Sequence, residues 1–70
     1  MGKNHKELNN TLKESRKASN LTQAELAVKV NVSRKSINSI ENGIYIPSTT
    51  LSLKLGKALN CSVSDLFQLP

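Results

Sequence analysis

The sequence predicts an all-α fold of five short helices. Turn-favouring residues recur at regular intervals, at Asn20, Asn31, Asn42–Gly43, Pro47 and Asn60. The segments between them are about 10–15 residues long and place apolar residues at helical spacing. Alternating apolar and polar patterns, which are typical of strands, are absent, so we expect no sheet.

The chain has room for one domain. It holds 70 residues, of which 37% are hydrophobic. That length is too short for a doubly wound sheet or a two-lobed enzyme. We therefore expect a single domain over 1–70 with its folded core at about 5–67, and a thin stability margin because so small a chain buries little surface.

The first predicted helix covers roughly 5–19 and has a weak apolar stripe. Leu8 and Leu12 lie four residues apart, but Ser15 stands where a third apolar residue is expected. Burying a serine there would lower stability and leave a small polar defect in the core.

The second predicted helix has a well-defined start. Thr22 can cap it while Glu25 reaches back to the cap, which is the capping-box pattern. Leu21, just before the cap, can pack against Leu26. The inward face then consists of three residues, Leu26, Ala27 and Val30.

Serines also begin the remaining predicted helices. Ser33 caps the third, which buries Ile37 and Ile40 and ends at Asn42–Gly43, where glycine favours a left-handed cap. The fourth follows Pro47–Ser48, and its apolar stripe contains Leu51, Leu53, Leu55, Ala58 and Leu59.

The fifth predicted helix has Ser62 and Asp65 as a second capping box, with Val63, Leu66 and Phe67 facing inward. Cys61 is expected to pack in the core rather than to sense redox state.

The second and third helices are joined by a very short turn. Only Asn31, Val32 and Ser33 separate them, and so short a connection sets two helices at a steep angle, as in a helix-turn-helix. Asn31 stands where the turn needs a left-handed residue, which asparagine tolerates better than most.

The outer face of the third helix carries the functional signal. Opposite Ile37 and Ile40 lies an arc without acidic residues, which contains Lys35, Asn38, Ser39 and Asn42, with Arg34 on its flank. Glu41 lies on the shoulder near the core. Cations and short neutral donors suit the major groove of DNA. The alternative is an ordinary solvated face, but such faces mix both charge signs.

Charge and composition favour a polyanionic partner. Ten Lys and Arg oppose five Asp and Glu, giving a net charge of +5. Nucleic acid or an anionic membrane would explain this excess, and simple solubility is the plain alternative. No apolar run is long enough to span a membrane, and no helix has the wide apolar face of a surface-bound one. A lone cysteine and the lack of a signal peptide favour the cytoplasm.

Catalytic chemistry is not indicated. The sequence has no Cys–His cluster, no metal-ligand spacing and no glycine-rich phosphate loop, and its one histidine is His5. We therefore expect no enzymatic activity, no cofactor, no metal and no small-molecule ligand.

Several segments together resemble the phage repressor Cro/CI-like helix-turn-helix family, also called XRE. They are LTQAELA at 21–27, VSR at 32–34, SINSIENG at 36–43, Pro47–Ser48 and Ala58–Leu59, and the similarity extends over roughly 12–67. The resemblance implies a lambda-repressor-like DNA-binding domain. Such a domain acts as a transcriptional regulator, most often a repressor, and binds a palindromic operator in double-stranded DNA as a homodimer.

The resemblance also implies roles for individual residues. Base contacts fall on Ser33, Arg34, Lys35, Asn38 and Ser39, and phosphate contacts on Gln23, Asn42 and Tyr45. Arg16 and Glu41 match a structural pair that ties the first helix to the end of the third. Three departures stand out: asparagines replace the usual glycines at 20, 31 and 60, Ser15 replaces an apolar residue, and Ile44 replaces a frequent lysine.

The loop after the third helix and the end of the chain predict the dimer interface. The candidate residues are Ile44, Ile46, Pro47, Leu66, Phe67 and Leu69. A rival function is an antitoxin-type interaction module that masks a toxin and also binds its own promoter. That function would favour an acidic or disordered extension, which the sequence lacks.

Overall fold

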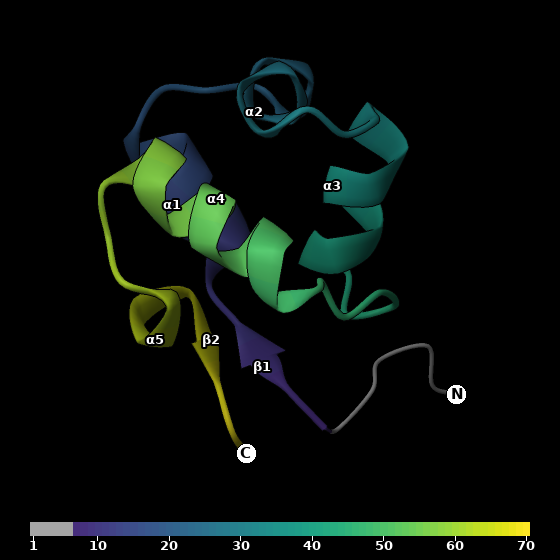
Figure 1. Cartoon of the computed structure of the whole chain (residues 1–70), viewed down its shortest axis with the longest axis vertical. Helices are drawn as coiled ribbons and strands as arrows, with labels where there is room; N and C mark the ends of the chain where they lie inside the picture. Colours follow the sequence, from purple (N-terminus) through teal and green to yellow (C-terminus); the bar gives the residue numbers. More distant parts are fainter. Residues whose placement is uncertain (1–6) are drawn as a thin grey trace.

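A computed structural model describes residues 7–70, which form five helices and a short two-stranded ribbon (Figure 1). In chain order the elements are β1 Asn9–Asn10, α1 Leu12–Ala18, α2 Gln23–Val30, α3 Arg34–Glu41, α4 Thr49–Leu59, α5 Val63–Leu66 and β2 Phe67–Gln68. The first residues, including His5, lie outside the described part of the chain. The expected all-α architecture with a helix-turn-helix is confirmed, except at the two ends.

The ends of the chain pair as an antiparallel ribbon, which corrects the expectation of no sheet. Asn9 lies opposite Gln68 and Asn10 opposite Phe67. The first helix accordingly begins at Leu12 rather than near residue 5, and the Asn10 side-chain oxygen accepts a hydrogen bond from the Leu12 N–H. Strands of two residues are too short to show alternation, so the sequence pattern could not reveal them.

The predicted starts of α2 to α5 are confirmed. Thr22 accepts a hydrogen bond from the Glu25 N–H at 3.0 Å, and the Glu25 carboxylate accepts one from the Thr22 N–H at 2.8 Å. Ser62 and Asp65 form a second reciprocal box. The remaining two serine caps, Ser33 and Ser48, also accept from the third residue of their helices. These caps satisfy backbone donors that would otherwise lack partners at the starts of α2 to α5.

The helices enclose one hydrophobic core. Its buried residues are Leu12, Leu26, Ala27, Val30, Ile37, Ile40, Leu51, Leu55, Leu59, Leu66 and Phe67. Leu53 is not among them and is 60% exposed, so its assignment to the inward stripe was wrong. It stands two residues from both Leu51 and Leu55, and about 200° of helical rotation turns it away from the core. In the described part of the chain every buried side-chain nitrogen and oxygen has a hydrogen-bond partner, so the defect expected at Ser15 does not arise.

Three asparagines hold left-handed backbone, as their positions predicted. Asn20, Asn31 and Asn60 have φ values of 60°, 61° and 57°. Asn31 and Asn60 end α2 and α4 in this conformation, which directs the chain sharply into the next element. Asparagine therefore preserves turns that glycine would form at lower cost.

Cys61 packs against the core beneath the end of α4. Its side chain is partly buried, and burial raises the pKa of its thiol, with the charge of Asp65 adding to the effect. Gly56 lies so close to this turn that a β-carbon at that position would be only 2.7 Å from the Cys61 carbonyl oxygen. The raised pKa disfavours the reactive thiolate, in keeping with a packing role.

A buried ion pair joins α1 to the end of α3. Arg16 Nε lies 2.6 Å from one Glu41 carboxylate oxygen, and Arg16 Nη2 lies 3.2 Å from the other. The side chains are only 8% and 3% exposed. The third donor, Nη1, bonds to the Leu21 carbonyl oxygen at 2.7 Å. The hydrogen bond to Glu41 raises the pKa of Arg16, which favours the charged form of the guanidinium.

Replacement of Arg16 by methionine should lower the free energy of unfolding by about 3–5 kcal/mol, because it leaves the Glu41 carboxylate buried without its cation. A chain of this length has only about 4–10 kcal/mol in total. The measurement is urea unfolding followed by circular dichroism. The double variant Arg16→Met with Glu41→Leu should lose less than the single one, and Lys17→Met on the exposed side of α1 serves as the control. Equal stability of Arg16→Met and Lys17→Met would contradict the assignment.

Asn60→Gly should match or slightly exceed the stability of the parent protein, whereas Asn60→Ala should lose about 1 kcal/mol. The reason is that an alanine β-carbon disfavours the left-handed backbone that glycine adopts freely. Thermal unfolding of the three proteins side by side measures the order. A more stable alanine variant would show that the left-handed conformation is absent in solution.

Candidate nucleic-acid interface

Helix α3 is anchored on one side and open on the other. Ile37 and Ile40 are buried beneath it, and the Ser33 side chain caps its start. Figure 1 shows α3 at one side of the molecule, beside α2 and above the loop that leads to α4. The side chains that point outward are exposed at Arg34, Lys35, Asn38 and Asn42 and half-buried at Ser36 and Ser39.

The outward face of α3 carries no negative charge. Glu41 is the one acidic residue of the helix, and its carboxylate is turned inward to Arg16. The cations of the helix, Arg34 and Lys35, both lie at its N-terminal end and are exposed. The position expected for Glu41 is therefore confirmed, and the open face of α3 presents only cationic and neutral polar groups.

One flank of this face is organised around Gln23, the first residue of α2. Its Nε2 donates to Asn38 Oδ1 at 3.1 Å and to Glu41 Oε1 at 3.0 Å. Its Oε1 accepts from Arg34 Nη1 at 3.0 Å. Both protons of the Gln23 amide are therefore engaged, and a continuous chain of hydrogen bonds links the surface arginine to the buried pair.

The other flank is a shallow hollow. It has a volume of about 260 Å³ and is lined by Ser33, Lys35, Ser36, Ser39, Ile44 and Tyr45. The Ser39 carbonyl oxygen accepts hydrogen bonds from the backbone N–H groups of Ile44 and Tyr45, at 3.0 and 3.3 Å, which holds the loop against α3. The structure thus brings three of the predicted base-contacting residues together with two loop residues.

Ser36 is the one residue of the hollow that sequence reasoning did not select. Its hydroxyl lies 3.1 Å from that of Ser33, one helical turn earlier. The three-residue spacing from Ser33 was the available signal, because residues three apart share a helix face. Asn42, in contrast, belongs to neither the Gln23 network nor the hollow and lies exposed at the end of α3.

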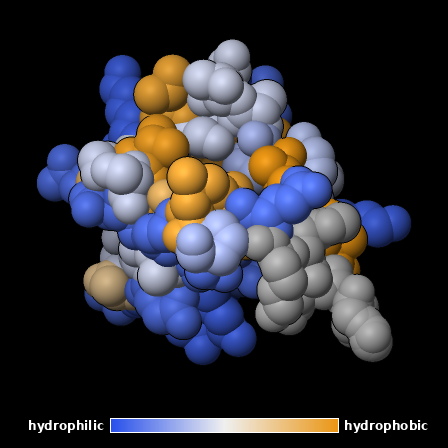
Figure 2. Space-filling view, turned by 90° about the horizontal axis from the view of Figure 1, so that it is seen from below, coloured by the Kyte–Doolittle hydropathy of each residue, from blue (hydrophilic) through white to orange (hydrophobic). Residues whose placement is uncertain are grey.

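The predicted dimer residues divide into two groups. Ile44, Ile46 and Leu69 are 47%, 42% and 82% exposed, and Figure 2 shows hydrophobic residues at the surface of the molecule seen from below. Leu66 and Phe67 belong to the core, and Pro47 is also buried. These three cannot offer surface to a second copy of this fold, which corrects the prediction. For Leu66 and Phe67, the structure agrees with the inward orientation that the pattern of the last helix predicted.

The described residues include no helix that is both long and apolar enough to cross a bilayer.

The sequence pattern of the helix-turn-helix family matches residues 12–66. An HTH-type transcriptional regulator of Methanocaldococcus jannaschii is 43% identical over 60 residues, which are 86% of this chain and 91% of that protein. A Bacillus subtilis regulator, YgzD, is 37% identical over 89% of this chain and 94% of its own length.

Solved structures agree with these similarities. The restriction-modification controller protein C.AhdI of Aeromonas hydrophila superposes with a TM-score of 0.73 at 31% identity, over 77% of this chain and 82% of that one. SinR in complex with DNA gives 0.70 at 32% identity, over 74% and 84%. The clp gene regulator ClgR of Corynebacterium glutamicum gives 0.73 at 31%, over 77% of this chain, which spans 57% of the ClgR chain. The fold is therefore the lambda-repressor-like DNA-binding fold, and the chain belongs to the Cro/CI-like (XRE) helix-turn-helix family, which consists of DNA-binding transcriptional regulators and not of enzymes.

Proposed function

We propose that this protein represses transcription in the cytoplasm by binding a palindromic operator in double-stranded DNA as a homodimer. The observation that carries the proposal is the outward face of α3, whose cations and amides are exposed while its one carboxylate is buried against Arg16. An α-helix fits the major groove of B-form DNA, and a face without acids approaches the phosphates without repulsion.

The proposed base contacts come from both flanks of α3. Arg34 suits guanine, because its guanidinium can bond both major-groove acceptors, and the Asn38 amide suits adenine in the same way. Ser33, Lys35 and Ser39 line the hollow that would receive the neighbouring base edges. Lys35 is equally suited to a phosphate, so we assign it to either contact.

The hydrogen bonds of Gln23 within the protein would have to be replaced by hydrogen bonds to DNA when the protein binds. Both Gln23 amide protons are engaged, so a contact to phosphate requires Gln23 to release Asn38 or Glu41, and Asn38 is the partner on the exposed side. That same release frees the Asn38 amide for a base, and Arg34 leaves the Gln23 oxygen when it turns towards the groove. The free protein therefore holds its contacting side chains on each other, and DNA replaces those bonds.

A dimer would double a small contact surface. One copy offers only a few base contacts, and two α3 helices in successive major grooves would lie about 34 Å apart. The exposed apolar residues Ile44, Ile46 and Leu69 support self-association. Asn42 and Tyr45, which are exposed at and after the end of α3, would reach the phosphates.

Selection of bound sequences from a random duplex pool tests the whole proposal. The selected duplexes should share two inverted half-sites about one helical turn apart. A single unrepeated half-site would contradict the dimer, and recovery of no preferred sequence would contradict specific recognition.

Arg34→Ala should weaken operator binding by about 1–3 kcal/mol and relax the preference at one base pair of each half-site. Gln23→Ala should instead weaken binding to most sequences alike, because its contact is to the backbone. Fluorescence anisotropy with the selected duplex and single-base variants measures both effects, with Lys17→Ala on α1 as a control. Unchanged operator affinity of Arg34→Ala would overturn its assignment.

Sedimentation of the protein at tens of micromolar should detect dimers. Ile46→Lys and Leu69→Lys should each weaken dimer formation, because a charge is costly to bury in an apolar contact. Leu53→Lys replaces an equally large exposed apolar residue on α4 and serves as the matched control. A protein that remains monomeric even on its selected duplex would refute the dimer.

A further inference from the structure

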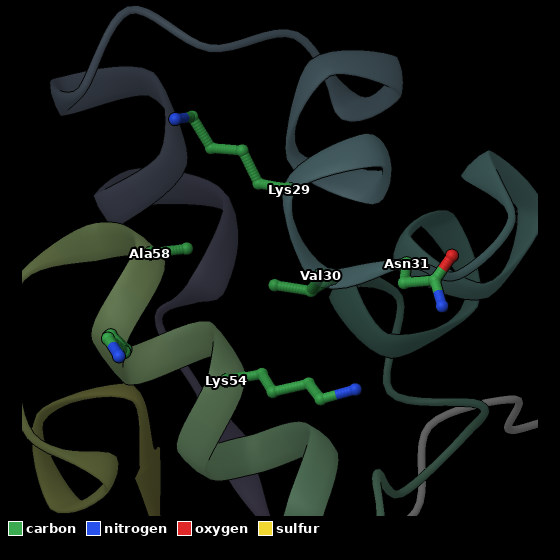
Figure 3. Close-up of a pocket in the computed structure, with 6 residues that line it drawn as sticks. Lys29, Val30, Asn31, Lys54 and Ala58 are labelled. Carbon is green, nitrogen blue, oxygen red and sulfur yellow. The ribbon is translucent and has the colours of Figure 1, made fainter.

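Most free lysines of helices α2 to α4 lie away from the proposed DNA-binding face. Lys29, Lys54 and Lys57 surround a pocket of about 390 Å³ between the end of α2 and the middle of α4 (Figure 3). By comparison, α3 contributes a single lysine, Lys35. A considerable part of the positive charge is therefore placed where DNA readout does not use it.

The pocket has an apolar wall and a cationic rim. Val30 is buried and Ala58 half-buried, and Figure 3 shows both side chains directed into the space between the two helices. Lys29 leaves α2 and Lys54 leaves α4, with Val30 between them in the same view. The small alanine opposite Val30 keeps the space open.

The rim is not neutralised by the protein. No acidic residue lines the pocket, and within residues 7–70 none of the three lysines forms an ion pair. Lys54 and Lys57 are three residues apart on one helix, where like charges repel each other and oppose folding. Helix dipoles account for Lys29 and Lys57, which lie in the last turns of α2 and α4, but not for Lys54.

The pocket is separate from the proposed DNA interface. It shares no lining residue with the hollow on α3 and none with the Gln23 network. The nearest structural connection is Asn31, which lines the pocket and turns the chain from α2 towards α3. A ligand in this pocket and DNA on α3 would therefore occupy different surfaces of one small body.

We propose that this pocket binds a small organic phosphate, whose phosphates lie at the lysine rim and whose body packs on Val30 and Ala58. Ammonium groups are common phosphate ligands, and an apolar wall favours an organic ligand over an inorganic ion. The volume lies within the range of about 300–1,000 Å³ that small-molecule sites occupy. The proposal does not depend on the function of α3.

The test uses metal-free ATP and inorganic pyrophosphate as probes, with ionic strength held constant by sodium chloride. Isothermal titration of the full chain should show ATP binding more tightly than pyrophosphate, because only ATP has a body for the apolar wall. The triple variant Lys29→Gln, Lys54→Gln, Lys57→Gln should bind ATP about tenfold more weakly or worse, because it removes all three charged contacts to the phosphates.

Two controls locate the binding. Arg34→Gln with Lys35→Gln removes the cations of α3 and should leave ATP binding unchanged. Lys54→Gln alone leaves both helix-terminal lysines in place and should weaken ATP binding severalfold. This single variant keeps the test decisive if the triple variant does not fold. The proposal is overturned if no probe binds, if Lys54→Gln binds as the parent does, or if the α3 variant abolishes binding.

Discussion

The buried pair of Arg16 and Glu41 is the interaction on which the architecture of the site depends. It fixes the end of α3 to α1, and a third donor of the same guanidinium holds the chain at Leu21, just before α2 begins. It also removes the one carboxylate of α3 from the surface that would face DNA. One ion pair thus sets both the position of the helix and the sign of its exposed charge. Such a pair is costly to bury, and its retention is understandable if it specifies this arrangement rather than adding stability.

The same carboxylate connects the core to the interface. Glu41 accepts a hydrogen bond from Gln23, and Gln23 in turn binds Asn38 and Arg34. Three of the side chains proposed to contact DNA, Gln23, Asn38 and Arg34, are consequently linked by hydrogen bonds to a buried carboxylate. Ordering them beforehand reduces the entropy lost on binding, although the bonds among them must be exchanged for bonds to DNA.

Much of the fold followed from local signals. The caps at Thr22, Ser33, Ser48 and Ser62 were predictable because a side-chain oxygen before a helix satisfies nearby backbone donors, and three asparagines marked left-handed turns because few other residues tolerate them. The terminal ribbon was not predictable, since strands of two residues carry no periodic pattern. Leu66 and Phe67 were predicted to face inward from the pattern of the last helix, and the structure buries both, so that their second assignment, to the dimer interface, does not fit. The Gln23 network and the lysine pocket depend on contacts between separate helices, which spacing along the chain does not specify.

The central claim is that the outward face of α3 meets duplex DNA. The most direct measurement is a two-dimensional NMR titration of the backbone and side-chain amides with a selected duplex. The account predicts the largest shifts in α3, at the side-chain amides of Gln23 and Asn38, and in the loop at Ile44 and Tyr45. Amides around Lys54 and Lys57 should change little. Shifts confined to the α2–α4 face, or no association at low ionic strength, would contradict it.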